Sequence, residues 1–426
     1  MKKLSLPLLL TLSVALGAQG QTLRLSLAEA QQYAVEHNAA MLNADLDIKK
    51  AELAKWKTLS SMLPQVKAGF DYQNMCGYTM NMGAFSIPMN PSGTFSLTAS
   101  VAFTGAMWVG AMLQDISMQM TDITRRQTEQ TTRANVKNVY VSILVMEQTV
   151  GLLDSSLANM ERLAATSQAS VDVGAAEQVD ADKLQIQVAT LRSSINSTNR
   201  SLQALRNSLL LQLGADVDAS LELTTSMDQI LSVDGAAMLL GQGFDITKNY
   251  NYQLLEQSEL LAKKNVTMAW MNFSPTLSAY YQYSKKHYFG DEGMNMTPPN
   301  MVGASLSVPL FTSGANTAAI KSAKIDLQEA VNSRHQAEDG LRVQYNQLCY
   351  DLASALETYD IQSRNIEVSR RVFDSVTEKY RYGRASSLEV TNASTDIISA
   401  QSNYIQAVMN VIAAQIALED LLNNQE

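Results

Sequence analysis

Cysteine, histidine and recognisable catalytic motifs are scarce in this chain. The two cysteines lie in unrelated contexts, Cys76 at the edge of a loop and Cys349 within a long helical pattern. They support neither a disulfide framework nor a cysteine-based metal site. The three histidines, His37, His287 and His335, are far apart, and no metalloprotease, nucleophile-elbow or phosphate-loop motif accompanies them. We therefore expect no catalytic residues, no cofactor and no metal site.

Positive charge and long apolar runs are also in short supply. The chain carries 32 Lys and Arg against 41 Asp and Glu, a net charge of −9. This balance argues against nucleic acid or acidic lipid as a partner. Beyond the amino terminus we find no apolar stretch of about 18 residues, the length that a membrane-spanning helix needs. If the protein enters a membrane, we expect it to do so through strands.

The amino terminus has the pattern of a secretory signal peptide. Lys2 and Lys3 precede an apolar core over residues 4–16, and the small residues Ala18 and Gly20 offer a cleavage site. We assign residues 1–20 to this signal.

One long helical pattern dominates the second half of the chain. From residue 315 to 382 there is no proline and a single glycine, Gly340. Apolar residues recur every seven positions with one four-residue step, which indicates a helix roughly 100 Å long. These positions are Ile320, Leu327, Leu341, Leu348, Leu352, Tyr359, Ile366, Phe373 and Tyr380. Gly383 ends the pattern and Ser386 opens a second helix that runs toward Leu422, so the sequence predicts a helical hairpin.

The same order of segments occurs twice. In the first half of the chain two helical patterns, over 108–171 and 177–213, also meet at a glycine, Gly174. Gly174 and Gly383 are 209 residues apart, a spacing that predicts a tandem duplication.

The duplication sets the expected domain boundaries. We place the first repeat at residues 21–213, a linker of short mixed structure at 214–245, and the second repeat at 246–426. Each repeat is expected to contain a shorter helix, two strands and a long hairpin.

Shorter elements are expected near the amino terminus. A first helix is predicted over 22–37, with Ser26 as its cap, and a second over 39–60. Residues 77–93 contain two prolines and three glycines and are expected to form a loop.

Four segments alternate apolar and polar residues with a period of two, which is typical of strands. They are residues 66–72, 95–103, 277–283 and 302–310. Each has roughly the length that crosses a bilayer at a tilt, about 9–11 residues. Taken singly, each could be a half-buried strand of a soluble domain. Four strands cannot close a barrel, and open edges are not tolerated in lipid, so membrane insertion requires several chains. Three chains would supply about twelve strands.

These segments together resemble the TolC family of outer-membrane efflux and secretion channels, over residues 22–424. The resemblance rests on the duplicated order of segments, on the corner at 309–314 before the long helix, and on the turn at 380–383 with the segment 388–390 beyond it. It implies a mainly α fold with a membrane β-barrel. Tandem long hairpins of three chains form an α-barrel, and four strands per chain contribute to a twelve-stranded outer-membrane β-barrel.

The resemblance also implies which residues form the periplasmic entrance. In the family the hairpin turns make the tip, and an acidic residue six positions after each turn glycine helps to ring the closed entrance. After Gly174 this residue is Asp180, and after Gly383 it is Glu389. The family tyrosine three positions before the second glycine is Tyr380.

Two family positions differ in this chain. The family has a second acidic residue nine positions after the glycine of the second repeat, and this chain has Asn392 there. The family also has an arginine two positions after that glycine, where this chain has Ala385, with Arg384 one place earlier. The implied gate residues are Gly174, Asp180, Tyr380, Gly383, Arg384 and Glu389.

Two interpretations of the tip acids remain open. Carboxylates from three chains around a pore axis would repel one another, raise each other's pKa and favour bound cations. Alternatively, Asp180 and Glu389 cap or solvate the starts of helices, where the helix dipole favours acids.

The loops between the strands are rich in methionine, and thioethers suit Cu(I). The residues concerned are Met75, Cys76, Met80, Met82, Met89, Met294, Met296 and Met301. Because apolar residues of flexible exposed loops are the better explanation of this pattern, we assign no metal site.

The function that the resemblance implies is a passive outer-membrane channel of a tripartite efflux or type I secretion system. The expected partners are two further copies of the chain in a homotrimer, a periplasmic adaptor protein, an inner-membrane transporter and outer-membrane lipid, without nucleic acid. The expected location is the outer membrane of a Gram-negative bacterium, with an extension into the periplasm. A single-hairpin periplasmic adaptor and a soluble or surface coiled-coil scaffold or adhesin are the alternatives. The cargo stays open between drugs, metals and proteins.

Overall fold

The computed structural model describes residues 22–83, 85–230, 233–290 and 298–423. The predicted signal peptide, residues 1–20, lies outside the described residues, as do Met294 and Met296 of the second loop.

The chain folds into two compact units, and each unit draws on both predicted repeats. The hairpin unit contains the segment that ends at Met41 together with Thr131–Gln242 and Leu348–Asp420. The sheet unit contains Leu42–Gln130, Gly243–Gln347 and the residues from Leu421 onward. The boundaries of the sequence repeats at 213 and 246 therefore do not coincide with those of the compact units.

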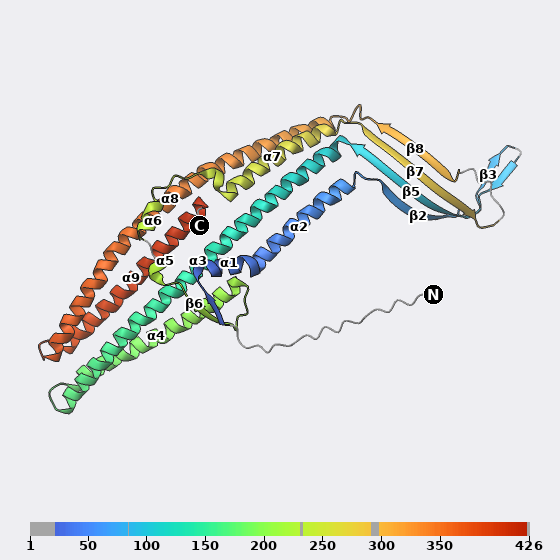
Figure 1. The fold of residues 1–426 in the computed structure, drawn as a ribbon. Helices are drawn as coiled ribbons and strands as arrows, with labels where there is room; N and C mark the ends of the chain where they lie inside the picture. The colour runs from blue at the N-terminus through green and yellow to red at the C-terminus, as the bar shows by residue number, and fades with distance from the viewer. Residues whose placement is uncertain (1–21, 84, 231–232, 291–297, 424–426) are drawn as a thin grey trace, which may run out of the picture. The chain divides into compact units, whose positions relative to one another are not determined.

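The sheet unit contains a four-stranded antiparallel sheet in the order β2-β5-β7-β8 (Figure 1). Its strands are β2 (Gln65–Gln73), β5 (Ser92–Thr104), β7 (Thr276–Tyr288) and β8 (Asn300–Ser307). The helices α2 (Ala39–Ser60) and α7 (Tyr250–Met271) lead into β2 and β7. All four predicted strands are confirmed. The central pair, β5 and β7, joins the two halves of the chain.

The alternating pattern gives this sheet one apolar and one polar face, because residues paired across a ladder share a face. The apolar face carries Val66, Ala68, Phe70, Tyr72, Phe95, Leu97, Ala99, Val101, Phe103, Leu277, Ala279, Tyr281, Tyr283, Val302, Ala304 and Leu306. The polar face is rich in serine and threonine, including Ser96, Thr98, Ser100, Ser278, Ser284 and Ser305. Most of the large apolar side chains are exposed, for example Phe70 at 68% and Val302 at 79%.

Two local predictions are wrong. Residues 77–93 are not a plain loop, since β3 (Thr79–Met82) and β4 (Phe85–Pro88) pair in it as a hairpin. Their four-residue length is too short for a periodic signal. The helix predicted from residue 22 begins only at α1 (Leu27–His37), because β1 (Thr22–Leu25) pairs in parallel with β6 (Ser220–Leu223). A partner almost 200 residues away leaves no local signal.

The cap of α1 is confirmed. The hydroxyl of Ser26 accepts a hydrogen bond from the Glu29 N–H, and the Glu29 carboxylate accepts one from the Ser26 N–H. This reciprocal capping box satisfies two backbone donors at the start of the helix.

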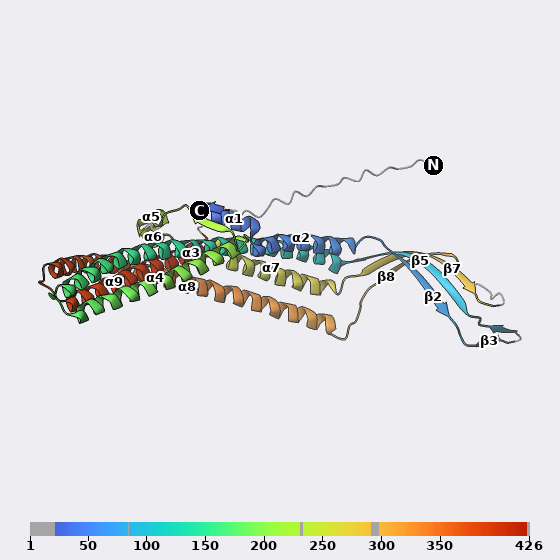
Figure 2. The same cartoon turned by 90° about the horizontal axis from the view of Figure 1, so that it is seen from below.

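The hairpin unit is built from four long helices. They are α3 (Gly105–Asp172), α4 (Gln178–Leu213), α8 (Ala315–Arg381) and α9 (Ser387–Leu422), of which α3 and α8 begin in the sheet unit. Figure 2 shows all four side by side near the turns that join them. The seven-residue repeat predicted for α8 is confirmed, both in its part within the sheet unit and in its part within the hairpin unit. The apolar residues of the repeat are buried or half-buried, and Leu352 is fully buried.

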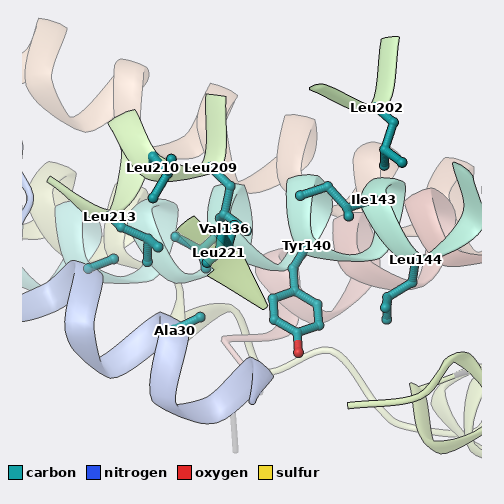
Figure 3. Close-up of a cluster of buried hydrophobic side chains, with 11 residues drawn as sticks. Ala30, Val136, Tyr140, Ile143, Leu144, Leu202, Leu209, Leu210, Leu213 and Leu221 are labelled. Atoms are coloured by element: carbon teal, nitrogen blue, oxygen red, sulfur yellow. The ribbon is translucent and has the colours of Figure 1, made fainter. Parts of the chain in front are cut away.

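One apolar core of the hairpin unit lies where α1 and β6 contact α3 and α4 (Figure 3). Ala30, Val136, Tyr140, Leu209 and Leu213 are buried there without exposed surface. The connection between the repeats supplies β6, followed by α5 (Met227–Ile230) and α6 (Val233–Leu239), and the 3-10 turn η1 (Ile246–Lys248) begins the second repeat. The described part of residues 214–245 therefore has the short mixed structure that the sequence predicts.

An ion pair between an arginine and a carboxylate joins the shorter helix to the longer one in each half of the sheet unit. Arg125 of α3 bonds Asp45 of α2 at 2.6 Å, and Arg334 of α8 bonds Glu259 of α7 at 2.7 Å. The two arginines are 209 residues apart, the separation of the turn glycines. In each half an arginine thus holds the shorter helix against the longer one.

We expected no helix that is apolar enough to span a membrane. By the criteria of length and composition alone, that expectation is wrong. α3 and α9 each contain such an 18-residue window. In α9 the stretch is interrupted by polar but uncharged residues, such as Gln406, Asn410 and Gln415, so it contains few charged residues although no single apolar run is long. More than half of each window is not buried within the single chain, although both helices also supply residues to the cores of the hairpin unit.

Tyr140 links the connection between the repeats to α3. It is fully buried, its hydroxyl donates to the Leu25 carbonyl at 3.0 Å, and it accepts from the Thr225 N–H at 3.2 Å. We expect Tyr140→Phe to lower the free energy of unfolding by about 1–3 kcal/mol, because two backbone groups lose a partner. Denaturation of the purified protein followed by circular dichroism measures this. The control Tyr350→Phe, at a side chain that is 72% exposed, should change little, and equal stability of both variants would contradict this role of Tyr140.

Candidate functional site

The turns that end α3 and α8 have the same backbone geometry. Gly174 and Gly383 have φ angles of +73° and +69°, in the left-handed region that favours glycine. At both turns the glycine N–H and the next N–H bond back to carbonyls of the last helical turn, as in a Schellman motif. Each long helix therefore ends at a defined residue.

The helices that follow these turns begin differently. At α9, Ser386 and Glu389 form a capping box, with the Ser386 N–H donating to Glu389 Oε2 at 2.7 Å and the Glu389 N–H donating to Ser386 Oγ at 3.2 Å. At α4 the cap residue Glu177 makes no side-chain cap bond. Asp180, which occupies the position equivalent to Glu389, is therefore available for other contacts.

Two hydrogen bonds join the first hairpin to the second. The Tyr380 hydroxyl of α8 donates to Ser167 Oγ of α3 at 3.0 Å. The Ser387 hydroxyl of α9 donates to Asp180 Oδ1 of α4. Both serines are almost completely buried, with 1% exposure at Ser167 and 3% at Ser387. We call these four residues the inter-hairpin latch.

An apolar core lies behind the latch and holds the four helices together. All four contribute to it, with Met160 and Leu163 from α3, Leu184 from α4, Phe373 from α8 and Val390 from α9. Tyr380 packs its ring against this core. The latch hydroxyls therefore bond in surroundings with little water, where an unpaired polar group is costly.

The structure brings some of the predicted gate residues together and not others. Asp180 and Tyr380 both join the two hairpins, but each bonds a serine and they do not bond each other. Glu389 is used by the capping box of its own helix. Arg384 is exposed, and its side chain makes no hydrogen bond or ion pair with the residues that the structure describes.

Sequence reasoning missed Ser167 and Ser387. Ser167 lies seven residues after the buried Met160, so it occupies an apolar position of the α3 repeat. A small polar residue at such a position is the signal that would have identified it. Ser387 follows the cap residue Ser386 and was indistinguishable from it in sequence.

The electrostatics of the two acids differ. Hydrogen bonds from the Ser386 backbone N–H and hydroxyl lower the pKa of Glu389 below its ordinary value of 4.5. Lys183 Nζ lies 3.8 Å from Asp180 Oδ1 on the same helix. Within one chain, then, the Glu389 carboxylate is favoured in its charged form.

No group of three or more His, Cys, Asp or Glu side chains suited to a metal ion occurs among the residues that the structure describes. Cys76 is exposed and has a φ of +52°, and its thiol points to the Asn74 carbonyl.

Comparisons with known proteins find relatives among bacterial outer membrane proteins. The family described as "Outer membrane efflux protein" matches residues 253–424. BepC, an outer membrane efflux protein of Brucella suis, is 22% identical over 301 residues, 69% of this chain. That match spans only 63% of BepC. TolC of Salmonella enteritidis is 22% identical over the whole of this chain and 88% of its own length.

A solved structure supports the same relationship at the level of the fold. The outer membrane protein VceC of Vibrio cholerae superimposes with a TM-score of 0.74 over 93% of this chain and 95% of VceC, at 16% identity. The chain therefore shares the overall fold of VceC. Sequence over residues 253–424 and fold over most of the chain are thus similar to those of outer membrane efflux proteins such as TolC.

Proposed function

We propose that the protein is a passive outer-membrane channel of a tripartite efflux or secretion system. The observation that carries this proposal is a sheet with one exposed apolar face and one polar face. In water such a face promotes aggregation. In a membrane it faces lipid while the polar face lines a water-filled passage. A soluble scaffold would need another cover for Phe70, Leu97 and Val302.

The edges of the sheet support assembly of several copies. β2 and β8 form its two edges, and neither has a further strand partner in the part of the chain that the structure describes. Neighbouring strands alternate in direction across the four strands, so β8 of one copy can pair antiparallel with β2 of the next. Since open edges are not tolerated in lipid, the ring must close, and we propose three copies, as the family resemblance implies.

The helices beside these edges have unpartnered apolar stripes. α2 precedes β2 and exposes Leu42, Leu46 and Leu53, while α8 follows β8 and exposes Ile325 and Val343. The residues of each stripe recur at intervals that place them on one helix face. We propose that the α2 stripe of one copy packs on the α8 stripe of its neighbour.

Tryptophan marks the proposed inner edge of the membrane. Trp56 lies near the end of α2, Trp108 in the first turn of α3 and Trp270 in the last turn of α7, each close to a strand. All three side chains are more than half exposed. Tryptophan is enriched at membrane–water interfaces because its ring is apolar and its N–H is polar.

The turns at Gly174 and Gly383 are the proposed periplasmic gate. A periplasmic adaptor and an inner-membrane transporter would open it by separating the hairpins, which must break the latch. Asp180, Tyr380 and Glu389 act there through the bonds described above, and Arg384 is free to meet a partner. The channel itself supplies no energy, and its cargo is a small molecule or a protein.

The channel proposal has a direct test. The protein extracted from membranes in detergent should have the mass of a trimer and should form single channels in planar lipid bilayers. A well-behaved monomer in detergent-free buffer, together with no pore after reconstitution, would contradict the proposal.

Removal of the latch should raise the conductance. Tyr380→Phe combined with Ser387→Ala deletes two buried hydrogen bonds, which stabilise the closed arrangement by about 2 kcal/mol per chain, so opening should become roughly thirtyfold easier. Single-channel recording measures this. Tyr382→Phe, at an exposed tyrosine two residues from Tyr380, is the control. Equal conductance of the latch variant and the control would show that these bonds do not hold the gate.

Glu389→Gln separates the two interpretations of the tip acids. The capping box lowers the pKa of Glu389, so its stabilisation is present above pH 4.5 and is lost as the pH falls through the lower folded value. We therefore expect faster amide exchange at residues 387–390 in the variant at neutral pH, and no difference in strong acid. Glu29→Gln, in the equivalent box of α1, should behave alike. A ring of mutually repelling carboxylates predicts the reverse, namely slower exchange in Glu389→Gln.

A further inference from the structure

We propose that the end of the apolar sheet face farthest from the helices binds the phosphate groups of an anionic lipid, through Lys285 and His287. This inference rests on the proposed function, since it requires that the face meets a membrane. Its occupant is a phosphorylated lipid of the outer leaflet.

The register of the sheet places both residues on the apolar face. Lys285 pairs with Phe95, which pairs with Phe70. His287 pairs with Gly93, which pairs with Tyr72. At the paired positions of this face, within the described residues, Lys285 and His287 are the only basic side chains. Both are exposed.

Aromatic rings surround this end of the face. The Phe289 ring lies 5.3 Å from the His287 ring and 5.8 Å from the Tyr72 ring, measured between centroids. Rings of Phe70 and Phe289 cover Gly93, where a Cβ atom would meet them at 3.1 and 3.3 Å. The rings provide an apolar platform beside the two basic groups, which suits a lipid whose chains are apolar and whose headgroup is anionic.

The distance along the strand puts the basic pair at a membrane boundary. Lys285 follows Leu277, the first apolar position of β7, by eight residues, which at about 3.4 Å each is roughly 27 Å along the strand. With a tilt of about 40° this becomes roughly 20 Å, close to the height of an apolar band of about 25 Å. The tryptophans lie beyond the Leu277 end, so Lys285 lies at the opposite surface, in the outer leaflet.

Charge supports the choice of occupant. A lysine beside hydrocarbon is costly unless an anion pairs with it, and Lys285 has no carboxylate within ion-pair distance among the described residues. The neighbouring Lys286 lies on the polar face, 4.9 Å from the Tyr288 ring. The net negative charge of the chain argues against acidic lipid as a general partner, but attraction at this place is local, because charges separated by more than about 10 Å are screened.

The test compares adjacent lysines on opposite faces. Detergent-purified channels are titrated with diphosphorylated lipid A and with the same lipid lacking phosphate, and bound lipid is counted by native mass spectrometry. We expect phosphate-dependent binding by the natural chain and about fivefold weaker binding in Lys285→Gln, with a further loss when His287→Gln is added. Lys286→Gln is the matched control and should bind normally, and Lys285→Arg should retain binding.

Three results would overturn the lipid site. They are unchanged binding in the double variant, an equal loss in Lys286→Gln, or equal binding of the lipid without phosphate. Conductance in bilayers free of lipid A is recorded for the same samples. If any of these results is found while trimers and conductance are normal, only the lipid site is rejected. If the wild-type chain forms neither trimers nor pores, the proposed function is rejected.

Discussion

The unsatisfied backbone groups along the edges of the four-stranded sheet constrain the rest of this structure. In water the edge N–H and C=O groups of β2 and β8 bond to solvent, whereas in lipid each unpaired group costs several kcal/mol. One chain cannot remove both edges, because its described part supplies only four strands to this sheet. The proposed assembly with identical copies would remove them. The same assembly would cover the apolar stripes of α2 and α8, so strands and helices favour the same neighbour.

The hairpin unit, if it forms the proposed gate, meets a different constraint, since it must hold together and also come apart. Its core of leucine, valine and alanine has no directional preference and would tolerate small shifts of one hairpin against the other. Hydrogen bonds do have directional preference, and the pairs Tyr380–Ser167 and Asp180–Ser387 fix one arrangement. Because all four groups can instead bond to water when the hairpins separate, the latch can break without leaving buried unpaired groups. This combination of an apolar core with a few polar contacts suits a gate.

The sequence predicts an element correctly where the interactions that form it are local along the chain, and fails where the partners are far apart in sequence. The long helices, the turn glycines and the four strands depend on periodicity and on local backbone preferences, which the residues carry themselves. β1 and β6 depend on each other across almost the whole first repeat, so Thr22–Leu25 was assigned to a helix. The residues of the candidate gate also divide into those with a local sequence signal and those without one. Gly174 and Gly383 were found from their turns, whereas Ser167 was missed because its partner is 213 residues away.

The sequence by itself determined the period of each element, the two faces of each strand, the duplicated order and the places where long helices must end. These properties arise from sterics and from the alternation of apolar and polar side chains within a few residues. Only the tertiary structure decided which strands are edges, which acid caps its own helix and which bonds the opposite hairpin. Those outcomes depend on distances between segments that are far apart along the chain, and no local pattern encodes them.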